Sequence, residues 1–182
     1  MSSIPRHLAD KRDVDPVEIY PLRLAQGKTF TGQYSATVPT NSSINLHLII
    51  PETIGLDGQF LWNIKGSGTG TVVENATVTT NPSNVITINN RNRYLNYPSN
   101  ITAVHSVTDI TGGTTLKTVL IGSSSSVPSG QIRSGGESRS LAEWGLKPGG
   151  EYTIILTNND TIALTGIVGI SFSELKIGEV YL

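Results

Sequence analysis

The chain has 182 residues, a formal net charge of −1 and a pI near 6.3, with 37% hydrophobic and 15% charged residues. This length fits one domain with its own core, and the small net charge gives no long-range field to attract nucleic acid or an anionic membrane surface. The lack of cysteine excludes disulfides, thiolate metal sites and thiol nucleophiles, and it fits folding in a reducing cytoplasm. The first residues lack the apolar core of a signal peptide, and no apolar run approaches the length of a membrane span, so we expect no membrane partner.

Residues 1–27 differ in composition from the rest of the chain. Charged residues of both signs are crowded together there beside Pro5, Pro16 and Pro21. Such a segment buries little apolar surface by itself, which predicts an extended N-terminal arm. Its second half contains Val17, Ile19 and then further leucines, and we expect it to dock on an apolar surface, either its own domain or a neighbour.

Residues 28–182 are predicted to form one β-sandwich domain. Apolar and polar residues alternate with a period of two, and turn-forming sequences at residues 51–58, 66–70, 81–84 and 111–113 separate the alternating runs. A helix is expected only as one turn at Leu141–Trp144. The pattern predicts an all-β protein, an antiparallel two-sheet sandwich of the jelly-roll kind. The expected strands cover residues 30–38, 44–50, 59–65, 71–80, 85–89, 101–108, 116–121, 152–157, 162–172 and 175–181.

Catalytic and metal-binding patterns are weak. The histidines, His7, His47 and His105, are far apart in sequence and have no ligand spacing, and we expect the last two at solvent-facing or subunit-facing strand positions. No Gly-x-Ser-x-Gly elbow occurs, and Gly66–Gly70 lacks the lysine of a phosphate loop. We therefore predict no catalytic residue, no metal and no cofactor. An acid–base pair stays open only as a combination on paper of Glu74, Asp109, Glu137, Glu143 and Glu151.

The aromatic residues allow a second interpretation. Trp62 alternates with Phe60 and Ile64, which predicts a core position. Trp144 follows a long Ser/Gly loop, residues 122–140, and is either an exposed contact or, more simply, a plug at the end of the sandwich. With Tyr94 and Tyr97 it could form a stacking platform for sugars.

Three features occur in a fixed order along the chain. They are the segment Val85–Arg93 with its Asn-Asn-Arg-Asn-Arg ending, the Ser/Gly loop, and Leu146-Lys147-Pro148 followed by the strand Tyr152–Asn158. This ordered set resembles the capsid decoration, or cement, proteins of tailed bacteriophages over roughly residues 60–175. The resemblance implies a jelly roll that oligomerises on the capsid exterior of the virion and holds major capsid subunits together. The arm before Lys28 and the end Lys176–Leu182 lie outside the matched pattern.

From this resemblance we expect the major capsid protein and further copies of the chain as partners, with a trimer favoured and a dimer possible, and no nucleic acid. A carbohydrate-binding sandwich or a head-fibre or tail-associated adhesion module is the alternative, and a hydrolase is the weakest reading. The expected capsid contacts in the arm are Arg6, Lys11, Arg12, Val17, Ile19 and Leu22. The expected intersubunit or rim residues are Arg91, Arg93, Arg133, Arg139 and Trp144.

Overall fold

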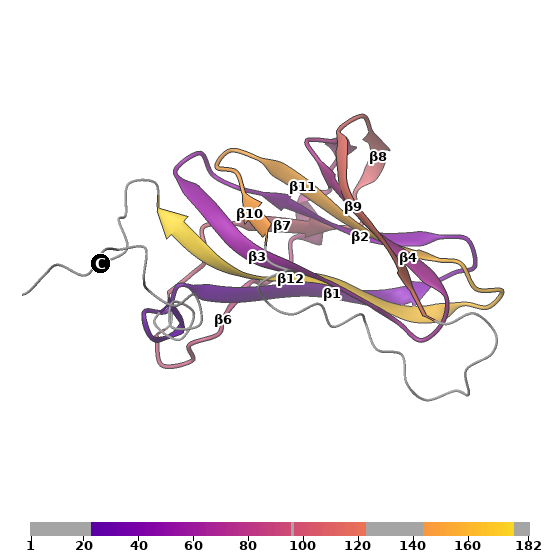
Figure 1. Cartoon of the computed structure of the whole chain (residues 1–182), viewed down its shortest axis with the longest axis horizontal. Coiled ribbons are helices and arrows are strands. Elements are labelled where there is room, and N and C mark those ends of the chain that lie inside the picture. Colours follow the sequence, from indigo (N-terminus) through magenta and orange to yellow (C-terminus); the bar gives the residue numbers. More distant parts are fainter. Residues whose placement is uncertain (1–22, 96, 123–143, 177–182) are drawn as a thin grey trace, which may run out of the picture.

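The computed structural model describes residues 23–95, 97–122 and 144–176, and within these ranges the protein is a β-sandwich. Two antiparallel five-stranded sheets lie face to face, as Figure 1 shows. Sheet A has the order β10-β3-β12-β1-β6, sheet B has the order β7-β2-β11-β4-β9, and β5 pairs with β8 separately. The elements are β1 (Thr29–Val38), β2 (Ser43–Ile49), β3 (Ile54–Ile64), β4 (Gly68–Glu74), β5 (Thr77–Thr79), the 3-10 turn η1 (Pro82–Asn84), β6 (Asn89–Asn90), β7 (Thr102–His105), β8 (Thr108–Thr111), β9 (Thr114–Ile121), β10 (Trp144–Leu146), β11 (Glu151–Asn158) and β12 (Leu164–Lys176).

Eight of these strands have the connectivity of a jelly roll. The run β1 to β4 pairs in reverse order with the run β9 to β12: β1 with β12, β2 with β11, β3 with β10 and β4 with β9. This long hairpin is rolled up so that β12 also pairs with β3, and β11 also pairs with β4. The expected all-β, antiparallel two-sheet architecture is confirmed.

The segment between β4 and β9 adds to the eight-stranded roll. It contributes β6 beside β1 at one edge of sheet A and β7 beside β2 at one edge of sheet B. It also forms the β5–β8 pair, which stands out from sheet B in Figure 1. The inserted segment therefore covers the β1/β2 side of the sandwich, where two strand edges would otherwise lack partners.

The core lies between the sheets because alternate residues of each strand face inward. On β12, Val168, Ile170 and Phe172 are buried, and Phe172 stacks on Phe30 with ring centroids 5.6 Å apart. Trp62 is 8% exposed and its Nε1 donates to the Ile155 carbonyl at 3.0 Å, so the predicted core position is confirmed. Burial of each large apolar side chain contributes about 1.5–3 kcal/mol.

Several predicted boundaries are wrong. Residues 85–88 form no strand although they alternate, because only an isolated bridge joins Val85 to Val104, and the half-buried Ile86 and Ile88 pack against the core as an extended cover. The expected loops at 51–58 and 66–70 are shorter, since β3 begins at Ile54 and β4 at Gly68. The stretch 71–80 is divided between β4 and β5, and 101–108 between β7 and β8.

The strands in the C-terminal part of the chain also differ from the prediction. One continuous strand, β12, replaces the described part of the two strands expected at 162–172 and 175–181, with residues 177–181 outside the described ranges. Trp144 begins β10 opposite Gly58 and is not helical, and the rest of the expected helical turn, residues 141–143, lies outside the described ranges as well. Pairing with β3 prevails over local helix signals here.

Candidate docking surface

The last residues of the predicted arm, Arg23–Gly27, lie against one end of the sandwich, and we call them the arm root. Residues 23–25 are helical, which the sequence did not predict, and the helical turn ends where Lys28 N donates to the Arg23 carbonyl at 2.9 Å and Gly27 N to the Leu24 carbonyl at 3.0 Å. Figure 1 shows this turn beside the loop after β6, at the end of the molecule where β12 finishes. The sandwich thus fixes the point at which residues 1–22 join it.

The Asn-Asn-Arg-Asn-Arg motif holds the arm root in place. Asn90 donates through its amide to the Gly27 carbonyl at 2.8 Å and to the Tyr97 carbonyl at 3.1 Å. Asn92 donates to the carbonyls of Leu24 at 2.9 Å and Ala25 at 3.1 Å. Asparagine suits this task because one side chain carries both donors and an acceptor.

A charged pair ties the arm root to sheet A. The Arg23 guanidinium lies 2.7 Å from Asp57 Oδ2, with the two side chains 12% and 34% exposed. Asp57 lies on β3 opposite Gly145 of β10. The partial burial of Arg23 makes the contact more than a surface ion pair, because desolvation strengthens charge-assisted hydrogen bonds.

The loop that holds the arm root exposes two tyrosines and two arginines. Tyr94 is 99% exposed and Tyr97 57% exposed, and the side chains of Arg91 and Arg93 are also exposed. We call these four residues the arm-root surface. Backbone turns fix it: Asn90 Oδ1 accepts from Asn92 N at 2.9 Å, and Asn92 Oδ1 accepts from Tyr94 N at 3.0 Å.

The far side of the same loop is anchored by a buried carboxylate. Glu174, at the end of β12, is 8% exposed and accepts from the Ser99 hydroxyl at 2.6 Å. It also accepts from Asn100 N at 2.8 Å and from the Asn100 amide at 2.7 Å. Hydrogen bonds of Asn90 and Asn92 on one side and of Glu174 on the other therefore hold the loop that exposes Tyr94 and Tyr97.

The structure brings together some of the predicted contact residues. Arg91 and Arg93 lie on the arm-root surface, where Arg91 also donates to Ser171 Oγ at 3.2 Å. Trp144 is half-buried, 6.1 Å from the Phe60 ring, so its role at the edge of the core fits the plug better than an exposed contact. The remaining predicted residues lie outside the described ranges: Arg6, Lys11, Arg12, Val17, Ile19, Leu22, Arg133 and Arg139.

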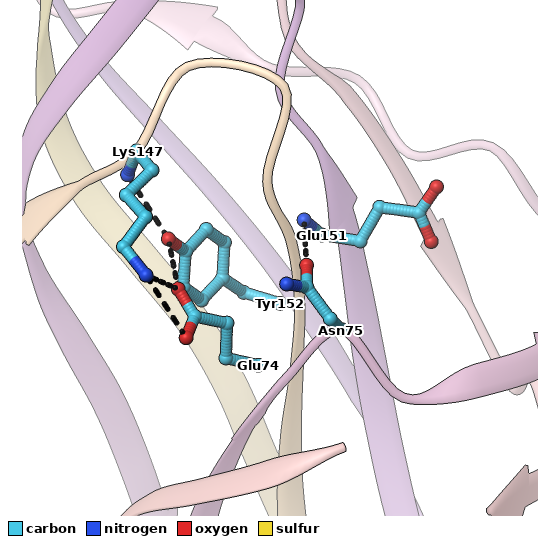
Figure 2. Close-up of polar contacts among 5 residues, drawn as sticks. All are labelled: Glu74, Asn75, Lys147, Glu151 and Tyr152. Carbon is cyan, nitrogen blue, oxygen red and sulfur yellow. Dashed lines mark hydrogen bonds and ion pairs between the residues drawn. The ribbon is translucent and has the colours of Figure 1, made fainter. Parts of the chain in front are cut away.

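A second polar cluster surrounds Tyr152 at the Lys-Pro turn (Figure 2). The Tyr152 hydroxyl accepts from Lys147 N at 2.9 Å and donates to Glu74 Oε1 at 2.9 Å, while Lys147 Nζ lies 3.2 Å from the same oxygen. Burial raises the pKa of Tyr152 to about 12, and the Glu74 carboxylate also favours the neutral hydroxyl. Glu151 points away from Glu74 in Figure 2, so these two acids do not form the pair that a glycosidase needs. The cluster closes the turn and fixes it to β4.

His47 is buried, and the expectation of a solvent-facing or subunit-facing position is wrong. It is 1% exposed, with Nδ1 3.0 Å from the Thr153 hydroxyl and Nε2 3.3 Å from Glu151 Oε2. Burial lowers the pKa of His47, and the Glu151 carboxylate partly offsets that effect. The order Thr, His, Glu is that of a hydrolase triad, but Thr153 is 0% exposed and no substrate can reach its hydroxyl.

The other described histidine, His105, is half-buried at the β1/β7 edge. Its ring stacks on Tyr34 with centroids 4.1 Å apart, and its Nδ1 lies 3.0 Å from the Ser106 hydroxyl. The same hydroxyl lies 3.3 Å from that of Tyr34. A hydroxyl beside an imidazole supplies a nucleophile and a base, yet in the described part of the chain no carboxylate orients His105 as the third member of a triad.

Among residues 23–95, 97–122 and 144–176, no group of three or more His, Asp or Glu side chains is placed to hold a metal ion. In the same residues, no helix has the length and apolarity needed to cross a membrane.

Comparison with known protein families finds no family model that matches the sequence, and comparison with characterised proteins likewise finds no match.

Proposed function

We propose that this protein is a non-enzymatic virion component, a decoration protein that binds the outside of a phage head and reinforces contacts between major capsid subunits. The observation that carries the proposal is the meeting of the arm root and the Asn-Asn-Arg-Asn-Arg loop at one end of a rigid jelly roll. The last residues of the predicted arm, Arg23–Gly27, and two of the expected rim residues, Arg91 and Arg93, therefore lie in one region. The resemblance in sequence to decoration proteins and the jelly-roll fold both support this role.

The chemistry of the arm-root surface suits a protein partner. Arg91 and Arg93 offer guanidinium donors to carboxylates and carbonyls, and the exposed rings of Tyr94 and Tyr97 provide apolar contact area at low entropic cost. Tyr and Arg are enriched where proteins bind one another. Each contact is weak, but symmetry repeats it many times over a capsid, and multiplied contacts give firm attachment.

The test is binding of the purified protein to undecorated heads of its own phage. We expect saturable binding at a fixed number of copies per head, and coated heads that resist heating better than bare ones. The double variant Arg93→Ala/Tyr94→Ala should bind at least about tenfold more weakly. Its matched control is Ile162→Ala, which changes a residue 61% exposed before the start of β12. The arm root lies near the other end of that strand, about 40 Å away.

Two results would count against the proposal. Bare and coated heads of equal heat resistance would remove the reinforcing role. Equal binding by the double variant and by Ile162→Ala would remove the arm-root surface from the contact.

A carbohydrate-binding role is the second candidate, favoured by the exposure of Tyr94 and Tyr97. Aromatic rings are common platforms for sugars because one face of a sugar ring is apolar. Trp144 contributes less to this role than expected, because it packs against Phe60. A glycan array with the wild type and Tyr94→Ala discriminates the two: a sugar signal that the variant loses favours carbohydrate binding, and no signal on any glycan retires it.

A further inference from the structure

The outer edges of the two sheets differ greatly in length. Within the described residues, sheet A ends in β6 with two residues and β10 with three, and sheet B ends in β7 with four and β9 with eight. Figure 1 shows β9 alongside β4. β9 therefore presents the longest row of backbone N–H and C=O groups paired on one side, and such rows are templates for pairing with another strand.

The two halves of β9 differ in how well they are protected against pairing with another strand. A bulge in the first half, where Leu116 has no partner opposite the step from Val72 to Val73 of β4, disturbs the ladder, and Lys117 lies beside it. Bulges and edge lysines are common devices against unwanted strand pairing. Thr118–Ile121 has neither device, contains no charge and no proline, and consists of a threonine and three aliphatic residues of high β-propensity or apolar character.

One side chain of this half is unusually exposed. Leu120 is 86% exposed on the outer face of sheet B, opposite Thr69, whereas Ile121 beside it is buried in the core. A leucine in this position leaves most of its apolar area in water. A strand added at this edge would cover part of that area.

We propose that the second half of β9 pairs with the same segment of a second copy of this chain, in antiparallel orientation about a two-fold axis, so that two B sheets become one. Pairing of a segment with itself requires only one self-complementary surface, and an uncharged segment does not repel its copy. A register centred on Val119 places Leu120 opposite Thr118 of the other copy on the outer face. It also places Lys117 opposite the other copy's Ile121, which avoids a pair of opposed lysines.

The experiment measures the oligomeric state of the full chain by sedimentation equilibrium at high micromolar concentration. We expect a dimer, and we expect Leu120→Lys to raise its dissociation constant about tenfold or more, because the apolar cover of Leu120 is lost and the two new lysines become diagonal neighbours on the outer face. Ile162→Lys, another exposed apolar residue changed to lysine, is the matched control and should leave the dimer intact. Circular dichroism checks that both variants remain folded.

A cross-link tests the register separately. The chain contains no cysteine, so a single Val119→Cys variant carries one thiol and should form an intermolecular disulfide under mild oxidation, whereas Ile162→Cys should not. A monomer throughout the concentration range overturns the proposal, and so does an oligomer that Leu120→Lys leaves unchanged. Neither result bears on binding to heads, because the arm-root surface comprises other residues.

Discussion

At the scale of single residues, Tyr152 shows how a buried polar group can stabilise a turn. We expect Tyr152→Phe to lower the free energy of unfolding by about 1–3 kcal/mol, because Lys147 N loses its acceptor and Glu74 loses a donor. Urea unfolding measures the change. Tyr97→Phe removes a hydroxyl from a side chain 57% exposed and should change stability by less than about 0.5 kcal/mol. Equal effects of the two variants would show that the Tyr152 hydroxyl contributes nothing.

His47 predicts a pH dependence of stability. Burial lowers the pKa of the folded protein's His47 below the ordinary value of 6.5, which the unfolded chain retains. Below pH 6.5 the unfolded chain therefore binds a proton that the folded protein does not, and the free energy of unfolding falls until the pH reaches the lowered pKa. Urea unfolding between pH 7 and pH 5 should show this fall in the wild type and less of it in His47→Gln.

A second variant checks the cause of that dependence. The Glu151 carboxylate raises the pKa of His47 against the effect of burial, so Glu151→Gln should lower that pKa further. The fall in stability should then extend to a lower pH than in the wild type. Parallel pH profiles for the wild type and His47→Gln would contradict the assignment to this histidine.

At the scale of elements, alternation in the sequence predicts most strands but not how loops attach to them. The period of two reports which residues face the core, so β1, β2, β9 and β11 fall close to their expected positions. Val85–Ile88 alternates for the same reason, since Ile86 and Ile88 face the core, yet alternation cannot reveal whether a neighbouring strand pairs with the backbone. The ladder partner is a tertiary property.

Buried polar side chains are the larger omission. In sequence, asparagines are typical of turns, and Asn90 and Asn92 gave no sign that they bind backbone carbonyls more than 60 positions away. Asn158 does the same with the carbonyls of Val38 and Pro39. The only hint in the sequence was the spacing of two between Asn90 and Asn92, and the same spacing is typical of an ordinary turn.

The hydrogen bonds from Asn92 to the arm root can be tested by hydrogen exchange. Asn92→Ala removes the donors to the Leu24 and Ala25 carbonyls, so residues 23–27 should exchange amide hydrogen with solvent faster. Mass spectrometry of peptides from this segment measures the rate. Asn63→Ala, a change on the exposed face of β3, is the control and should leave the rate unchanged. Equal exchange in the two variants would mean that the motif does not hold the arm root.

At the scale of the whole molecule, the stability of the sandwich depends on how closely the two sheets approach. Gly70 of sheet B lies against Trp62 of sheet A, and a Cβ at position 70 would be 2.8 Å from the indole ring. We expect Gly70→Ala to force the sheets or the indole to move and to lower the free energy of unfolding by about 1–3 kcal/mol. Gly145 has open space around its Cα and no left-handed backbone angle, so Gly145→Ala should stay within about 0.5 kcal/mol of the wild type. Urea unfolding followed by tryptophan fluorescence compares the two variants. Identical unfolding midpoints would mean that the space between Gly70 and Trp62 can accommodate a methyl group.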